Sequence, residues 1–171
     1  MPKNILITYA TYTGSAETVA EIVSSDLTAK GFKTTLIPMS EIHDLNGYDA
    51  VIAGSAIHGG RWLPEAFDFL DQHKEALTAK PFAAYLVCMT MAMKNSEKYL
   101  QFVSDFMIPV RKIVKPISEG LFAGKLEIKK LPSLSDKLKF RISVAAGVWK
   151  EGDHINRTEI SRWSESISHL L

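Results

Sequence analysis

The sequence predicts an α/β domain in which helices cover both faces of a parallel β-sheet, the doubly wound arrangement. Short apolar runs rich in β-branched residues alternate along the chain with amphipathic helical stripes. This alternation is typical of parallel strands joined by crossover helices. The runs show no polar alternation, as expected of strands buried on both faces. At 171 residues the chain suits one domain, which we expect to span residues 1–171.

The first half of the chain supplies three strands and two helices. Ile5–Tyr9 is an apolar strand, and the helical stripe after it stops at Gly31, a residue suited to a C-terminal cap. Residues 34–37 and 50–55 have the character of the second and third strands. Pro64 then suits the first turn of a helix, where its missing N–H group costs nothing.

The second half repeats the alternation twice more. Phe82–Cys88 is the fourth strand, and the apolar spacing over residues 99–110 predicts an amphipathic helix. Residues 120–123 begin the fifth strand. The last helix has a clear start signal, because Asn156 and Glu159 stand at the two positions of a capping box.

Composition excludes several classes of protein. Cys88 is the only cysteine and lies in an apolar run, where a buried, unreactive thiol is expected. With no disulfide and no signal-peptide pattern, we expect a cytoplasmic location. No apolar stretch is long enough to span a bilayer, and the net charge of +1 gives no indication of a nucleic-acid partner. We expect no metal site.

The loop after the first strand combines three hydroxyl side chains with a glycine immediately before a helix. Hydroxyls and backbone N–H groups at a helix N-terminus bind phosphate, and ligands of doubly wound sheets lie beyond the carboxyl ends of the strands. The same hydroxyls also serve as ordinary helix caps, so both interpretations stay open. The sequence motifs of nucleotide triphosphatases and of dinucleotide-binding folds are missing here. The loop reads Thr11-Tyr12-Thr13-Gly14-Ser15-Ala16.

Three segments resemble known flavoproteins. Tyr9–Ser15 resembles the FMN phosphate loop of flavodoxins, whose pattern is Thr-x-Thr-Gly-[Ser/Thr]-[Ala/Thr]. Gly54–Pro64 is similar to a loop of the flavodoxin-domain proteins grouped with menaquinone-dependent protoporphyrinogen IX dehydrogenase, and Phe122–Leu126 is a third match. The resemblance covers nearly the whole chain. It implies a flavodoxin-like fold, with a five-stranded sheet in the order 2-1-3-4-5, and one bound FMN.

The resemblance also implies where FMN binds. Its phosphate would lie in the first loop, and its isoalloxazine ring between the loops that follow strands three and four. The implied cofactor residues of the first loop are Thr11, Tyr12, Thr13, Gly14, Ser15 and Ala16. Those of the two later loops are Ser55, Ala56, Ile57, His58, Gly59, Gly60, Arg61, Trp62, Thr90, Met91, Ala92 and Met93.

Several of these side chains have more than one interpretation. His58 could relay a proton or hydrogen-bond the ring, and Arg61 could stabilise reduced flavin, pair with substrate carboxylates or remain solvated. Trp62 suits stacking on a planar ring or the core of the domain. The methionines of the third loop suit packing or a substrate surface. Beyond the candidates His58 and Arg61 we assign no catalytic residue, because the flavin itself carries redox chemistry.

The resemblance implies an FMN-dependent oxidoreductase similar to the quinone-linked protoporphyrinogen dehydrogenases. Its electron acceptor would be a quinone or a redox protein, and its substrate a porphyrinogen. The alternative is a flavodoxin-type electron carrier that serves protein partners and has no small substrate of its own. The sequence leaves the oligomeric state open.

Residues 125–150 form an insertion before the last helix with a marked local charge. It holds seven basic and two acidic residues, a net charge of +5. One interpretation is a basic amphipathic helix that lies on the inner face of the cell membrane, where a quinone would be found. The other, which we favour, is a helix or strand that packs its apolar face on the core. The apolar residues of the insertion recur every three or four positions, at Leu131, Leu134, Leu138, Ile142, Ala145 and Trp149.

Overall fold

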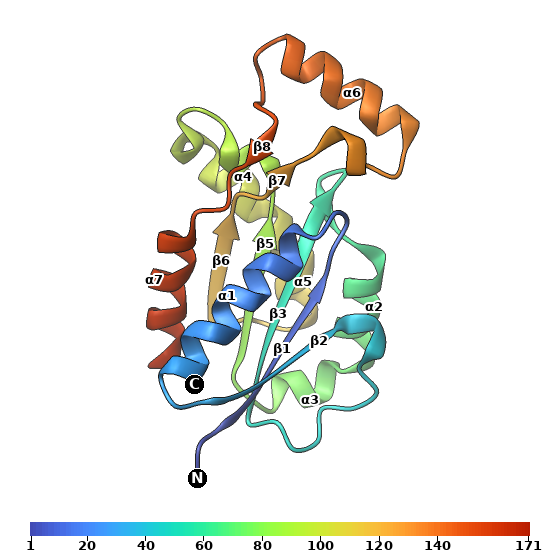
Figure 1. Cartoon of the computed structure of the whole chain (residues 1–171). Coiled ribbons are helices and arrows are strands. Elements are labelled where there is room, and N and C mark those ends of the chain that lie inside the picture. The colour runs from blue at the N-terminus through green and yellow to red at the C-terminus, as the bar shows by residue number, and fades with distance from the viewer.

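The computed structural model describes residues 1–171 and contains a five-stranded parallel sheet with helices on both faces (Figure 1). The strands hydrogen-bond in the order β2-β1-β3-β5-β6. Counted along the chain, these parallel strands have the order 2-1-3-4-5, so the predicted fold class is confirmed. Their bounds are β1 Asn4–Ala10, β2 Lys33–Pro38, β3 Ala50–His58, β5 Phe82–Val87 and β6 Ser118–Phe122.

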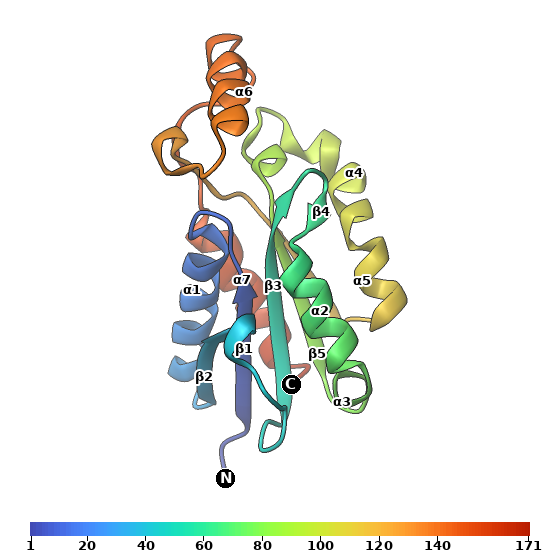
Figure 2. The ribbon, with the colours of Figure 1, turned by 90° about the vertical axis from the view of Figure 1, so that its right-hand side faces the viewer.

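Two helical layers enclose the sheet (Figure 2). One face is covered by α1 (Ser15–Ala29) and α7 (Arg157–Ser168), and the other by α2 (Pro64–Gln72), α4 (Leu100–Ser104) and α5 (Ile108–Ile113). A short helix, α3 (Lys74–Thr78), leads into β5. The cap predicted for the last helix is present, since the Asn156 side chain accepts a hydrogen bond from the Glu159 N–H group at 3.3 Å.

The helix predicted over residues 99–110 is interrupted. The structure divides this segment into α4, a 3₁₀ turn over Asp105–Met107, and α5. Pro109 lies in the first turn of α5. A proline inside a helix removes one hydrogen bond and its ring collides with the carbonyl group four residues earlier. One continuous α-helix is therefore replaced by two short helices with a tighter turn between them.

The packing of the core explains why the sequences of these strands are continuous apolar runs. Every residue of β5 is buried, and so are six of the seven residues of β1. Because helices cover both faces, neither set of alternating side chains meets water. Cys88 lies in this core with 7% exposure, as its apolar surroundings predicted.

A close contact between two neighbouring strands of the sheet holds the start of α1 in place. The ring of Tyr85 on β5 passes over Gly54 on β3, and its hydroxyl donates a hydrogen bond of 2.8 Å to the carbonyl oxygen of Ala16. A Cβ atom at position 54 would lie 1.9 Å from Cζ of Tyr85. Gly54 is thus required for a contact that holds the N-terminal turn of α1.

The insertion is a separate lobe beyond the carboxyl ends of the strands (Figures 1 and 2). Its stem is an antiparallel pair, β7 (Lys125–Leu126) with β8 (Gly152–Asp153). The stem carries a 3₁₀ turn and the helix α6 (Leu134–Ala145). No helix in the structure has both the length and the apolar character that crossing a bilayer requires.

The favoured expectation for this insertion, an apolar face packed on the core, is wrong. Leu134, Leu138 and Ile142 are 81%, 62% and 61% exposed. Helix α6 turns its other face inward, where Asp136 is buried and Phe140 and Val144 pack on a small second cluster. The outward and the inward residues of α6 both recur at intervals of four, so their spacing in the sequence does not show which face is buried. The members of this second cluster are Leu126, Ile128 and Leu131, with Tyr12, Met89, Phe140, Val144 and Trp149 packed against them.

Candidate functional site

The first and second predicted loops meet beyond the carboxyl ends of β1 and β3, at the edge of a doubly wound sheet where ligands bind. The stem of the insertion joins them there. Gly124 packs so closely that a Cβ atom on it would lie 2.8 Å from Val87 and 3.1 Å from the Ser15 hydroxyl. The first loop, the end of β5 and the start of the insertion are therefore packed tightly against one another.

The first loop has the geometry of an anion site. Gly14 precedes α1 with φ of +94°, a left-handed conformation that favours glycine. The Thr11 hydroxyl accepts a hydrogen bond from the Gly14 N–H group, and the Ser15 hydroxyl accepts one from the Lys125 N–H group, both at 2.9 Å. Each hydroxyl therefore keeps its own hydrogen free to donate.

The helix-capping interpretation of these hydroxyls is not supported. The N-cap position of α1 is Gly14, and no side chain caps this helix end. The N–H groups in the first turn of a helix have no partners within the helix. Together with the hydroxyls of Thr11, Thr13 and Ser15, they form a donor set that suits a phosphate and involves no cationic side chain.

The second loop is a β-hairpin. Strand β4 (Arg61–Trp62) pairs antiparallel with the end of β3, and Gly59 and Gly60 make the turn with φ of +60° and +76°. Ser55 closes the base of this hairpin, because its buried hydroxyl accepts a hydrogen bond from the Leu63 N–H group at 3.0 Å. Of the implied cofactor residues, Ser55 thus has a structural role in the hairpin.

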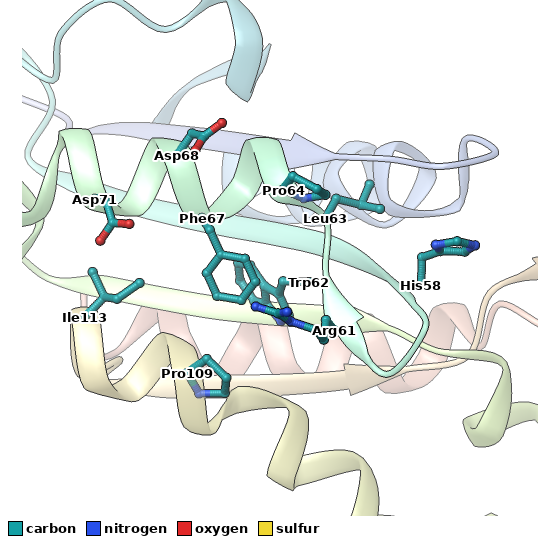
Figure 3. A pocket seen from close by; sticks show the side chains of 10 residues that line it. All are labelled: His58, Arg61, Trp62, Leu63, Pro64, Phe67, Asp68, Asp71, Pro109 and Ile113. Carbon is teal, nitrogen blue, oxygen red and sulfur yellow. The ribbon is translucent and has the colours of Figure 1, made fainter.

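Trp62 and Arg61 differ in burial, because Trp62 is buried and Arg61 is exposed. Trp62 is 2% exposed, which favours the core interpretation and leaves no open face for stacking. The Arg61 guanidinium lies 5.7 Å from the centre of the Phe67 ring, a cation–π contact. Both side chains line a groove of about 570 Å³ between α2 and α5 (Figure 3). His58 stands at the end of this groove.

A smaller cavity of about 80 Å³ lies beneath the insertion. His58 lines this cavity as well as the groove, so it is the side chain that both spaces share. Met89, which immediately precedes the predicted third loop, lines the cavity, whereas Met91 of that loop packs against the core. Residues 90–93 do not line the cavity, which favours packing as the role of Met91. The cavity lies between Tyr12, Thr13, Ser15, Ala56, Ile57, His58, Val87, Met89, Gly124, Lys125, Leu126, Leu131 and Phe140.

Asp136, which the sequence did not single out, connects the loops. Its Oδ2 atom accepts a hydrogen bond of 2.8 Å from the Tyr12 hydroxyl and lies 3.1 Å from Nε2 of His58. The Tyr12 and His58 rings are in contact, with centres 4.5 Å apart. The two hydrogen bonds hold the pKa of the Asp136 carboxyl below its ordinary value. Burial, and then the hydrogen bond to Asp136, raise the pKa of the Tyr12 hydroxyl.

This lowered pKa predicts a specific acid sensitivity. A carboxyl whose pKa is lower in the folded state stabilises the protein above its unfolded pKa, and that stabilisation is lost as the pH falls through the folded pKa. We expect Asp136→Asn to lower the free energy of unfolding near neutral pH, and the difference from wild type to shrink as the pH falls below the ordinary carboxyl range and through the lowered pKa of Asp136. Urea denaturation over a series of pH values from neutral to acidic measures this. A difference that stays constant with pH would contradict the assignment.

Comparison with known proteins supplies the family. The sequence model of the flavodoxin domain matches residues 6–147. This chain belongs to the flavodoxin domain family. Members of this family bind FMN and pass electrons to redox partners. None of the curated protein sequences compared with the chain matches it significantly.

Solved flavodoxin structures share the fold of this family member. A flavodoxin from Streptococcus pneumoniae superposes with a TM-score of 0.61 at 16% identity, covering 98% of this chain and 99% of that one. A short-chain flavodoxin associated with a bacterial microcompartment gives 0.56 at 21% identity, covering 84% and 99%. Flavodoxin 2 from Bacillus cereus gives 0.52 at 27% identity, covering 84% and 99%.

Proposed function

We propose that this flavodoxin-domain protein binds one FMN and transfers electrons through it. The observation that carries the proposal is the first loop, where the hydroxyls of Thr11 and Ser15 keep their own hydrogens beside the uncapped start of α1. Bound FMN would supply the one- and two-electron chemistry. The phosphate would be held by Thr11, Thr13, Gly14, Ser15 and Ala16.

The roles of the remaining site residues follow from their positions. Tyr12 and His58 border the cavity next to the phosphate loop, where they can orient a ring by stacking and hydrogen bonding. The His58 side chain lines both the cavity and the groove. It is therefore placed to move a proton between a ring in the cavity and a molecule in the groove. Trp62 and Ser55 hold the hairpin that carries His58.

The specific reaction that we propose is oxidation of a porphyrinogen with a quinone as acceptor. It is supported by the resemblance of the Gly54–Pro64 and Phe122–Leu126 segments to porphyrinogen dehydrogenases. The groove beside the hairpin adds to this support, because Arg61 can pair with carboxylates at its mouth. Anaerobic protoporphyrinogen should bleach the flavin absorption, and a menaquinone analogue should restore it. Absence of bleaching would remove the substrate while leaving FMN binding intact.

An electron carrier is the second candidate. The carrier function is favoured by an exposed apolar patch beside the third loop, on which a redox protein could dock. The patch lies on α4 and just before it, where Tyr99, Leu100 and Phe102 are 37%, 45% and 56% exposed. A redox titration discriminates between the candidates. In a carrier the two electrons should enter the flavin in well-separated steps, whereas a dehydrogenase working on a two-electron donor has no such requirement.

Peripheral contact with the inner face of the cell membrane is the localisation that we propose. It is supported by the outward face of α6, where exposed Leu134, Leu138 and Ile142 lie among basic side chains. The double variant Leu138→Ser and Ile142→Ser should lose binding to anionic liposomes, whereas Leu100→Ser on α4 should keep it. A folded double variant that binds liposomes like wild type would contradict the proposal.

A further inference from the structure

One buried carboxylate oxygen joins three segments that are far apart in the sequence. Tyr12 comes from the first loop, His58 from the end of β3, and Asp136 from the first turn of α6. Oδ2 of Asp136 lies 2.8 Å from the Tyr12 hydroxyl and 3.1 Å from Nε2 of His58. Asp136 is 8% exposed, so water competes little for these hydrogen bonds. Hydrogen bonds to a charged group are about twice as strong as neutral ones.

Apolar contacts reinforce this connection. Tyr12 and Met89, from the edge of the sheet, pack against the small cluster of the insertion. On the insertion side Phe140 and Trp149 complete the contact, with ring centres 5.2 Å apart. The contact therefore extends well beyond Asp136, which is its polar centre.

The connection closes the space between the cofactor loops. The cavity enclosed by Tyr12, His58 and the insertion measures about 80 Å³, whereas sites for ligands of cofactor size usually exceed about 300 Å³. A cavity of this volume does not hold a tricyclic ring while these contacts are made. The lobe must therefore move for such a ring to reach the first and second loops together.

We propose that Asp136 is a positioning residue of the cofactor site, which latches the insertion over Tyr12 and His58 and thereby limits the rate at which FMN is taken up. This inference rests on the proposed function. It gives the insertion a second role, distinct from that of its outward apolar face: the inner face of α6 controls access, and Asp136 supplies the polar part of the contact.

The test is the rate of FMN association, measured by stopped-flow quenching of flavin fluorescence with FMN-free protein. Asp136→Asn should associate about tenfold faster, the factor that corresponds to ~1.4 kcal/mol. Tyr12→Phe, which removes one of the two hydrogen bonds, should fall between this variant and wild type. Glu127→Gln is the matched control, because it removes an exposed carboxylate of the same insertion that pairs only with Lys130.

A second measurement tests the contact between the insertion and the first two loops in the absence of FMN. Amide hydrogen exchange over residues 131–150 should be faster in Asp136→Asn than in wild type or in Glu127→Gln. A merely structural role for Asp136 would speed exchange without speeding association, and that result would overturn the inference. Equal or slower association in a folded Asp136→Asn protein would also overturn it. Wild-type protein that takes up no FMN would overturn the proposed function as well.

Discussion

Gly14→Ala is expected to weaken FMN binding at least about tenfold, a loss of ~1.4 kcal/mol. Gly14 has φ of +94°, and a residue with a Cβ atom in the left-handed region costs about 1–2 kcal/mol. No atom lies within 4 Å of the Cβ position, so the strain is in the backbone. The loop can relieve that strain only by rotating its peptide groups, which moves the N–H donors away from the phosphate.

Gly31→Ala is the matched control for this prediction. Gly31 has φ of +91° at the other end of α1, and its Cβ position is equally open. Both variants should therefore lose similar stability in urea denaturation, but only Gly14→Ala should lose affinity in a fluorescence titration with FMN. Equal FMN affinity in the two variants would contradict the assignment of the phosphate loop.

Gly54→Ala is expected to destabilise the fold by about 3 kcal/mol, the upper part of the usual range for overpacking a core. The new Cβ atom would lie 1.9 Å from Cζ of Tyr85. The Tyr85 side chain is completely buried and is held at its tip by Ala16, so it cannot move aside. Urea denaturation followed by circular dichroism measures the free energy of unfolding.

Replacing Tyr85 by a shorter side chain tests the cause of this loss. Tyr85→Leu should itself be destabilising, because it leaves a cavity and removes a hydrogen bond. In that background, however, Gly54→Ala should cost much less than it does in the wild type, since the colliding ring has gone. Strictly additive effects in the double-mutant cycle would mean that Tyr85 is not the obstacle.

The strands and the phosphate loop could be predicted from the sequence because their signals are local. A strand buried on both faces has an apolar run of its own, and the loop of residues 11–16 combines hydroxyls with Gly14 over six positions. The hairpin of β3 and β4 also has a local signal in the sequence. Gly59 and Gly60 are a glycine pair between two strand residues, which is typical of a two-residue turn.

The arrangement of the insertion could not be predicted in the same way. Which face of α6 turns inward depends on Asp136, and its partners Tyr12 and His58 are 124 and 78 residues away in the sequence. Nothing near Asp136 indicates those partners, and its position near Ser133 is explained by a local cap. The sequence therefore does not distinguish Asp136, the residue that joins the loops, from the other charged residues of the insertion.

The most direct test of the account is an equilibrium titration of the purified protein with FMN, followed by calorimetry and visible absorption. We expect saturation at one FMN per chain. At an FMN concentration of about 100 times Kd, the folded state should gain roughly 2.7 kcal/mol and melt at a higher temperature. A protein that neither carries nor takes up FMN, and whose melting temperature does not change when FMN is added, would contradict the central claim.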